Sequence, residues 1–204
     1  RFQKIQEHLN DTKKLDQFDM VNLLRDTNGL KNKALGYGNE KALNQLLAHH
    51  AIVFQPDKKL VWVSSNPYQL GEFTAYDLNK IFKDSIQNYK LNVDSLVIQK
   101  DNFLTSEAYK KYEEFRVKNA ETETFLDENK TIETNFLTNY INTNTEYWVV
   151  YANVADYYFK QKDYLQAINY YKLALSKEIT TIPDRNKIEK NLKKCLQKTA
   201  KINH

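Results

Sequence analysis

The chain has 204 residues, of which 41% are hydrophobic and 13% aromatic, with a formal net charge of +4. This composition supplies enough apolar side chains for a packed core and excludes a largely disordered chain. The single Cys195 excludes an internal disulfide, no Cys/His cluster predicts a zinc site or another metal site, and no apolar run approaches the roughly 20 residues that span a bilayer.

Charge is distributed unevenly along the chain. Residues 147–204 hold 11 basic and 5 acidic residues, whereas residues 1–146 hold 19 and 21. A basic tail can meet an acidic partner or an anionic membrane surface, but a solvated, lysine-rich helix face is the simpler interpretation. No arginine-rich or glycine-aromatic recognition motif accompanies the charge, so we expect no nucleic-acid partner.

Helix dominates the predicted secondary structure, because only 4 Gly and 3 Pro interrupt the chain. Apolar residues recur at helical spacing over residues 1–9 and again over about 17–26. Asp16 is placed to cap the second of these helices. Three glycines, Gly29, Gly36 and Gly38, then predict a loop.

A β-hairpin follows, formed by His50–Phe54 and Leu60–Ser64 around a turn at Pro56-Asp57. Both strands are apolar nearly throughout, which predicts covering layers on both faces. Two strands alone are marginal in water, so the hairpin should belong to a larger sheet. We find no convincing third strand in the sequence. The chain also begins with Arg1 inside a helical pattern, and both features predict that a partner segment lies upstream.

Beyond a loop at residues 66–71, the pattern is helical over residues 76–86, 105–129 and 132–141. Asn and Thr residues at 142–145 mark the clearest internal boundary. The sequence therefore predicts an α+β chain in three parts, comprising a sheet-containing region at residues 1–88, a helical connector at 89–146 and a helical tail at 147–204.

The tail resembles a tetratricopeptide repeat, a helical hairpin of about 34 residues. The helix-contact positions are small, at Ala155, Ala167 and Ala174, and the positions around them are aromatic. Asp163 can cap the second helix, and Pro183 opens a third, closing helix. The resemblance implies a protein-interaction surface, with Tyr151, Tyr158 and Tyr171 as its candidate residues. The alternative is that the tail only packs the C-terminal region onto the main body, since one repeat offers little concave groove.

Residues 47–56 (LAHHAIVFQP), 60–64 (LVWVS) and 69–78 (QLGEFTAYDL) carry a second resemblance. They resemble the C-terminal half of the acyl-CoA:6-aminopenicillanic acid acyltransferase-like family, which are N-terminal-nucleophile hydrolases related to choloylglycine hydrolases and acid ceramidase. The likeness covers roughly residues 1–80 and extends more loosely to about residue 140. It implies an αββα sandwich, of which this chain would supply an incomplete part.

This family resemblance also implies a chemistry. Such enzymes cleave themselves to expose an N-terminal Cys, whose own amine activates it for attack on an amide or thioester acyl group, including acyl-CoA. The nucleophile would come from an upstream segment, and the chain alone is predicted to be inactive. Arg1 is the counterpart of an active-site Arg in the family, or an ordinary Arg at a helix start. Cys195 is assigned no catalytic role, and no cofactor is implied.

Four further residues are candidates for a pocket near the hairpin, namely His49, His50, Asn66 and Tyr68. If His49 and His50 lie on the strand, they point to opposite faces and cannot bind one metal ion together. For either histidine, a satisfied buried side chain is the main alternative to an acid–base role. Asn66 and Tyr68 follow the second strand, where a pocket can form, and the neighbouring Trp62 fits a pocket or the core equally well.

Two functions follow from these patterns. The first is the C-terminal portion of a cysteine amidohydrolase or acyltransferase, and the second is a non-catalytic interaction module that uses the helical tail. The sequence leaves the acyl substrate, the oligomeric state and the cellular compartment undecided.

Overall fold

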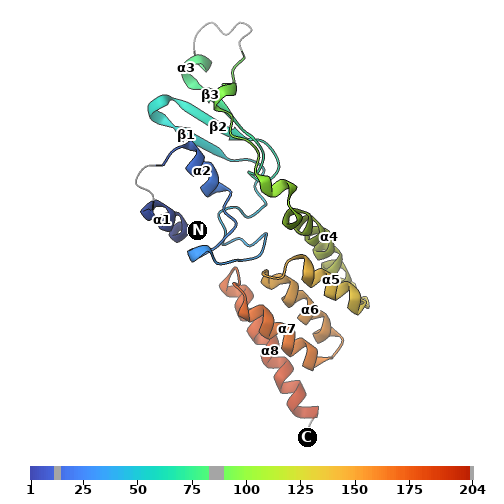
Figure 1. Ribbon diagram of the computed structural model, residues 1–204. Helices are drawn as coiled ribbons and strands as arrows, with labels where there is room; N and C mark the ends of the chain where they lie inside the picture. The colour runs from blue at the N-terminus through green and yellow to red at the C-terminus, as the bar shows by residue number, and fades with distance from the viewer. Residues whose placement is uncertain (12–14, 83–89, 203–204) are drawn as a thin grey trace. The chain divides into compact units, whose positions relative to one another are not determined.

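The computed structural model describes residues 1–11, 15–82 and 90–202 (Figure 1). The fold is α+β, mostly helical, with one three-stranded antiparallel sheet. Packing divides the chain into two compact units. The first, here called the sheet unit, comprises Arg1–Lys33 and Glu40–Ser106, and the second, the helical unit, comprises Ala34–Asn39 and Glu107–His204. The division at residues 106 and 107 differs from the predicted divisions after residues 88 and 146.

Two helices open the sheet unit, α1 at Phe2–Asp11 and α2 at Gln17–Leu24. Asp16 caps α2 as predicted, because its carboxylate accepts hydrogen bonds from the Phe18 and Asp19 amides at 2.8 and 2.9 Å. The Asp19 carboxylate accepts a reciprocal bond from the Asp16 amide, which completes a capping box. The start of α2 is therefore determined by local sequence.

The sheet consists of β1 (Ile52–Gln55), β2 (Leu60–Ser64) and β3 (Phe73–Asp77) in that order. The β1–β2 hairpin is confirmed, with Val53 opposite Trp62 and a short 3-10 turn at Pro56–Lys58 between the strands. The prediction that the chain lacks a third strand is wrong, because β3 pairs with β2 along its whole length. The hairpin is thus completed to a sheet by its own chain.

The sequence predicts a helix over residues 76–86, and the predicted first residue of that helix is wrong. Phe73 and Ala75 alternate inward, which is the period of a strand, and helix begins only after Asp77, which caps the single turn of α3 (Leu78–Ile81). The end of the predicted helix, residues 83–86, lies outside the described residues.

One face of the sheet packs on α2. Val53, Trp62 and Ala75 from the three strands meet Val21 of α2, and Phe73 and Ile98 complete this core. Trp62 is fully buried, and its indole N–H donates to the Leu96 carbonyl at 2.8 Å. Of the two interpretations of Trp62, core packing is therefore the correct one.

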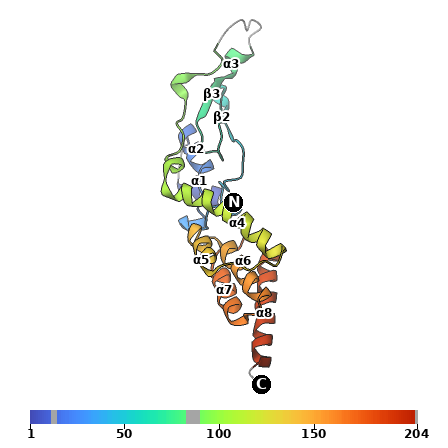
Figure 2. The same cartoon turned by 90° about the vertical axis from the view of Figure 1, so that its right-hand side faces the viewer.

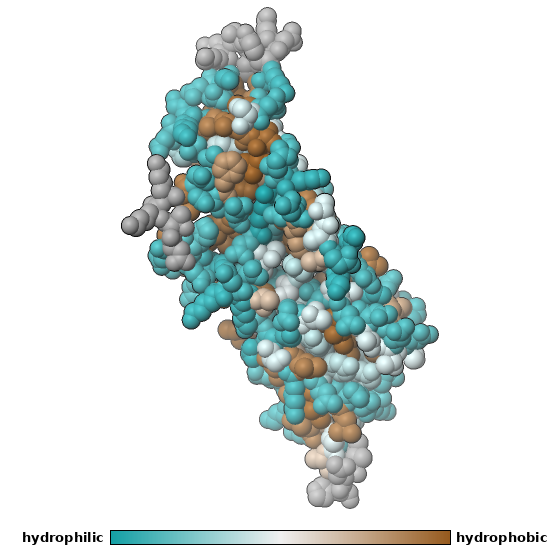
Figure 3. Space-filling view, viewed as in Figure 1, coloured by the Kyte–Doolittle hydropathy of each residue, from teal (hydrophilic) through white to brown (hydrophobic). Residues whose placement is uncertain are grey.

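The opposite face of the sheet is partly open at β1. Ile52 and Phe54 are 46% and 63% exposed, so the expectation of two covered faces is not met within the described residues. Figure 3 shows hydrophobic side chains gathered over the strands of this unit. Val63 and Val61, which lie opposite Ile52 and Phe54 on β2, are more shielded because β2 is the central strand.

Arg25 holds the loops at one end of the sheet unit. Its guanidinium nitrogens donate to the carbonyls of Gly71 and Gln99 at 2.9 and 2.8 Å and to that of Gln69 at 3.3 Å. The Asp101 carboxylate lies 3.8 Å from Nε and partly balances the charge. These contacts use the donors of Arg25 on backbone acceptors, so its role is structural.

Five helices form the helical unit: α4 (Glu107–Asp127), α5 (Thr134–Thr143), α6 (Trp148–Lys160), α7 (Tyr164–Ser176) and α8 (Ile182–Ile202). Successive helices pack against one another, as Figure 2 shows for α5 to α8. The predicted helical hairpin and closing helix are confirmed as helices α6, α7 and α8.

Close contact between α6 and α7 depends on three alanines. Ala155, Ala167 and Ala174 are all fully buried, as expected for small residues where two helices approach closely. Asp163 caps α7 by accepting a hydrogen bond from the Gln166 amide at 3.1 Å. Small contact residues and a local cap thus define this hairpin from sequence.

The segment Ala34–Asn39 is bound to the helical unit as a strap. The Asn144 side chain accepts a hydrogen bond from the Tyr37 amide at 3.1 Å and donates to the Tyr37 carbonyl at 2.8 Å. Gly36, with φ of +79°, lies so close to Tyr147 that a Cβ atom would approach its backbone nitrogen to 2.4 Å. Asn144, in the predicted boundary at residues 142–145, is buried and joins the strap to the helices on either side of that boundary.

Candidate functional site

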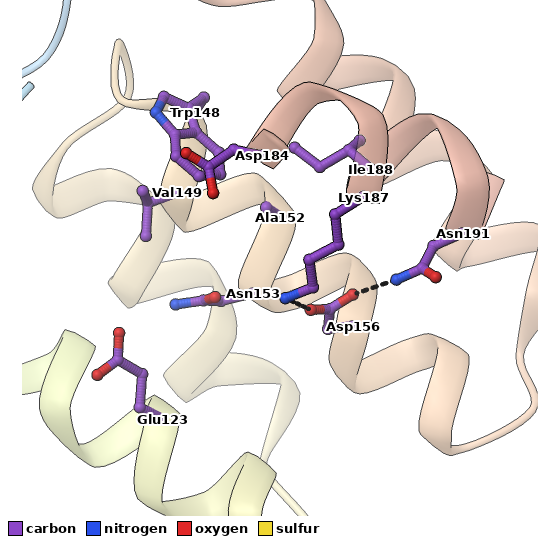
Figure 4. Close-up of a pocket in the computed structure, with 10 residues that line it drawn as sticks. All are labelled: Glu123, Trp148, Val149, Ala152, Asn153, Asp156, Asp184, Lys187, Ile188 and Asn191. Carbon is purple, nitrogen blue, oxygen red and sulfur yellow. Dashed lines mark hydrogen bonds and ion pairs between the residues drawn. The ribbon is translucent and has the colours of Figure 1, made fainter. Parts of the chain in front are cut away.

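The floor of the candidate site is one face of α6. Trp148, Val149, Ala152, Asn153 and Asp156 line a pocket of about 200 Å³ (Figure 4). Their spacing of one, three and four residues places them on a single helix face. The opposite face of α6 carries the buried residues that pack on α7. The face toward the pocket carries both polar and apolar side chains.

Helices α4 and α8 form the two walls. Glu123 comes from α4, and Lys187, Ile188 and Asn191 come from α8, with Asp184 at the start of that helix. A second pocket of about 570 Å³ shares Glu123, Asn153, Asp156, Lys187 and Asn191, and extends to Leu126, Asp127, Phe159 and Lys160. Because they share these residues, the two pockets form one groove along α6, here called the α6 groove.

Asp156 is the electrostatic centre of this groove. Its Oδ1 accepts a hydrogen bond from the Tyr171 hydroxyl and a longer one, at 3.4 Å, from the Asn191 amide. Its Oδ2 lies 3.6 Å from the Lys187 ammonium. Burial and the adjacent Asp156 carboxylate both raise the pKa of Tyr171, so the phenol stays protonated and remains a donor. In Figure 4, Lys187 and Asn191 both reach toward Asp156.

A second polar network holds Asn153. Its side-chain amide donates to Asn119 Oδ1 at 3.2 Å and to the Tyr140 hydroxyl oxygen at 3.1 Å, and that hydroxyl donates to Asn119 Oδ1 at 2.5 Å. Burial raises the pKa of Tyr140, which keeps this hydroxyl neutral. Within the described residues, the Asn153 carbonyl oxygen has no hydrogen-bond donor, so it is available as an acceptor.

The arrangement is suited to binding. It presents carboxamides, carboxylates and two lysines along an open groove, and Asn153 and Asp156 are held by buried tyrosines. The part of the chain that the structure describes contains no group of three or more His, Cys, Asp or Glu residues placed to hold a metal ion. Cys195 is buried, and burial raises the pKa of its thiol, which opposes nucleophilic reactivity.

The residues implied by the hydrolase resemblance do not assemble into a site. Arg1 is exposed and precedes α1. His49 and His50 are also exposed and lie in the coil before β1, so both the strand placement and the expectation of a buried histidine are incorrect. No contact within the described residues joins Arg1 to either histidine.

Asn66 and Tyr68 lie in the loop between β2 and β3, as predicted. Asn66 is exposed, and the Tyr68 carbonyl accepts a hydrogen bond from the Asn44 side chain at 3.0 Å. Neither residue lines the α6 groove. Their shared loop is confirmed, and their role in a pocket stays a prediction.

Two of the three tyrosines proposed as an interaction surface are buried. Tyr171 is fully buried and donates to Asp156, and Tyr151 is buried with its hydroxyl donating to the Thr145 carbonyl at 2.9 Å. Tyr158 is half-buried and stacks on Tyr170 at 5.6 Å between ring centroids. Their helical positions were predicted correctly, but Tyr151 and Tyr171 support the helices from within and do not face a partner.

The polar residues of the groove were missed from sequence. Asn153 and Asp156 interrupt an otherwise apolar helix at adjacent positions of one face, and Lys187 and Asn191 are four residues apart on α8. These spacings are visible signals within each helix. The convergence of these residues from three helices cannot be predicted from the sequence, because no local pattern pairs residue 123 with 156 or 187.

No helix within the described ranges is both long enough and apolar enough to cross a membrane. Comparison with known protein families, with curated proteins and with solved structures finds no match to this chain.

Proposed function

We propose that the chain is a protein-interaction module that holds an extended segment of a partner protein in the α6 groove. The observation that carries this proposal is the groove itself, lined by side chains from α4, α6 and α8. Extended peptides carry unpaired backbone donors and acceptors, which carboxamide side chains can satisfy. Asn153 on the floor and Asn191 on the α8 wall supply such groups.

The resemblance to tetratricopeptide repeats supports the same proposal. One helical hairpin has too little concave surface to bind a peptide, but α4 and α5 precede the α6–α7 hairpin and α8 follows it. The groove is lined by α4, α6 and α8, and none of its lining residues comes from α5 or α7. In a stack of helical hairpins every second helix lines the concave face, and α4, α6 and α8 follow that alternation.

Partly buried polar networks favour binding over plain packing. Asp156 and Asn153 each have partners on other helices, which restricts their rotamers before a ligand arrives. Side chains that are already ordered lose less conformational entropy when a ligand binds. A surface that only packs one helix onto another needs no such polar network.

The helical unit also offers an internal example of the chemistry. Asn144 holds the Tyr37 backbone, which lies in a turn, through one donated and one accepted hydrogen bond. The strap Ala34–Asn39 is thus a peptide segment bound by this helical unit in cis. A partner segment in the α6 groove would be bound by the same type of contact in trans.

The proposal is tested by filling the groove with a bulky side chain. Val149 lines the pocket and is partly exposed, so Val149→Trp should block a peptide without emptying the core. The matched control, Asn169→Trp, adds the same ring at an exposed position of α7 outside the groove lining. Peptides enriched by the parent chain from a random displayed library should lose binding to Val149→Trp and keep it with Asn169→Trp. Equal retention by both variants would remove the proposal.

A second candidate function rests on the sheet unit. The exposed Ile52 and Phe54 leave one face of the sheet uncovered within the described residues, which supports a sheet that a further layer completes. On this proposal the chain is the C-terminal portion of an acyltransferase-like amidohydrolase with an αββα sandwich, and a segment outside residues 1–204 supplies the nucleophilic Cys. The isolated chain would then be inactive.

Its test compares the chain alone with the chain joined to its natural upstream sequence. Hydrolysis of acyl amides and acyl thioesters should appear only in the longer protein and be lost when the proposed N-terminal Cys is replaced by Ala. Activity from residues 1–204 alone, or no suitable Cys upstream, contradicts this candidate.

A further inference from the structure

The exposed face of α8 carries a stripe of lysines. The helix holds seven basic residues against two acidic ones. Five of the seven, Lys187, Lys190, Lys194, Lys198 and Lys201, follow one another at intervals of three or four residues. At about 3.6 residues per turn these five side chains fall within about 80° of the helix circumference, and they extend over about 21 Å at 1.5 Å per residue.

The lysine stripe, as these five residues are called below, lies beside the α6 groove. Lys187 and Asn191 line the groove, whereas Ile188 and Cys195 of the same helix are buried. The stripe continues along α8 from Lys187, which is its first member. It is therefore an extension of the groove wall and not an isolated surface elsewhere.

Most of the stripe has no counter-charge. Lys187 pairs with Asp156 at 3.6 Å, but Lys190, Lys194, Lys198 and Lys201 form no ion pair with any described residue. The two acidic residues of α8, Asp184 and Glu189, lie outside the arc of the stripe. Aligned like charges repel one another, so the arrangement raises the free energy of the unbound chain unless an anion compensates it.

The chemistry of the stripe favours an acidic peptide over other polyanions. An anionic membrane surface is bound by helices that pair a cationic face with inserting apolar side chains, but Ile188 and Cys195 of α8 are buried in the helical unit and cannot insert. Single-stranded nucleic acid is held by aromatic stacking together with charge, and α8 carries no aromatic residue along its length. Carboxylates on an extended segment match a lysine row that continues along α8 from Lys187 in the groove wall.

We infer that the lysine stripe determines which partner the groove accepts, namely an extended segment whose acidic side chains run along α8. This inference rests on the proposed peptide-binding function. On the opposite wall, Glu123 and Asp127 lie four residues apart on α4 and repel acidic side chains. The two walls together direct the carboxylates of the bound segment toward α8 and set its orientation.

The experiment measures binding of labelled peptides to the full chain by fluorescence anisotropy. The probes are alternating Glu-Gly and Lys-Gly peptides of about 10 residues, which span about 33 Å when extended. The stripe variant is Lys190→Gln, Lys194→Gln, Lys198→Gln. The control variant is Lys111→Gln, Lys172→Gln, Lys193→Gln, which removes the same charge at exposed positions outside the stripe.

We expect the Glu-Gly peptide to bind and the Lys-Gly peptide not to bind. The stripe variant should weaken binding about tenfold, as the loss of three exposed ion pairs implies, and the control variant less than about twofold. Glu123→Gln combined with Asp127→Asn should strengthen binding, because it removes the repelling wall. Added salt should weaken the parent complex by screening.

Equal losses in the stripe and control variants would overturn the inference, because only net charge would then matter. Tighter binding of phosphatidylserine vesicles or of single-stranded RNA than of the Glu-Gly peptide would also overturn it. If library peptides depend on Val149 but are neutral or basic, this inference fails while the proposed function stands. If no peptide depends on Val149, the proposed function itself fails.

Discussion

The two units of the chain use partly buried polar side chains in different ways. In the sheet unit, Arg25 donates to the carbonyls of Gly71 and Gln99, so its polar groups hold backbone loops in place. In the helical unit, Asp156 and Asn153 bond to other side chains and present their remaining atoms to a groove. Polar side chains of the sheet unit thus hold main chain in place, whereas those of the helical unit converge on the concavity that we propose as a binding site.

The largest expected effect contrasts two aromatic residues of the sheet unit. Trp62→Ala removes a fully buried side chain and its hydrogen bond to Leu96, and should lower the unfolding free energy of this unit by about 3–5 kcal/mol. Phe54→Ala, on the open face, should lower it by less than about 1 kcal/mol, because Phe54 is already 63% exposed. Urea unfolding followed by circular dichroism measures both changes. A large loss from Phe54→Ala would mean that the open face is covered in solution.

A smaller effect is expected at the strap of the helical unit. Asn144→Ala removes both hydrogen bonds to the Tyr37 backbone and should lower the unfolding free energy by about 1–3 kcal/mol. Amide hydrogen exchange at residues 34–39 should accelerate in this variant. Asn142→Ala, at an exposed position of α5, is the control and should leave exchange there unchanged. Unchanged exchange in Asn144→Ala would show that the strap is held by other contacts.

The smallest effect concerns the pH dependence of the helical unit. Burial and the nearby Asp156 carboxylate raise the pKa of Tyr171 above its ordinary value of 10.0, so the folded state favours the protonated phenol. That contribution to stability is fully present below pH 10 and declines as the pH rises above it. Tyr171→Phe should lower the unfolding free energy at neutral pH by about 1 kcal/mol and weaken the loss of stability above pH 10. An alkaline profile identical to that of the parent chain would contradict the assigned role of Tyr171.

Much of the helical unit could be predicted from sequence because its signals are local. Helices α4 to α8 follow the spacing of their apolar residues, and Asp163 caps α7 within a few residues of its own position. The same holds for Asp16 at the start of α2. The spacing could not predict the burial of Tyr151 and Tyr171, because a tyrosine at a helix-contact position can be a core residue or a surface residue.

Strand β3 and the α6 groove were missed because both depend on residues distant in sequence. The five residues of β3 are too short a run to show clear alternation, and they become a strand by pairing with β2. The groove needs Glu123, Asp156 and Lys187, from three different helices, to line the same concavity. The expected strand position of the histidines was wrong because β1 begins later than its apolar pattern indicates and leaves His49 and His50 exposed in coil.

The most direct test of this account is binding of one groove-selected peptide to the parent chain, to Val149→Trp and to Asn169→Trp, measured by calorimetry. The account predicts binding to the parent chain and to Asn169→Trp with similar affinity, and at least a tenfold loss, equivalent to about 1.4 kcal/mol, with Val149→Trp. Equal affinity of all three proteins for the peptide would contradict the claim that the α6 groove is the binding site.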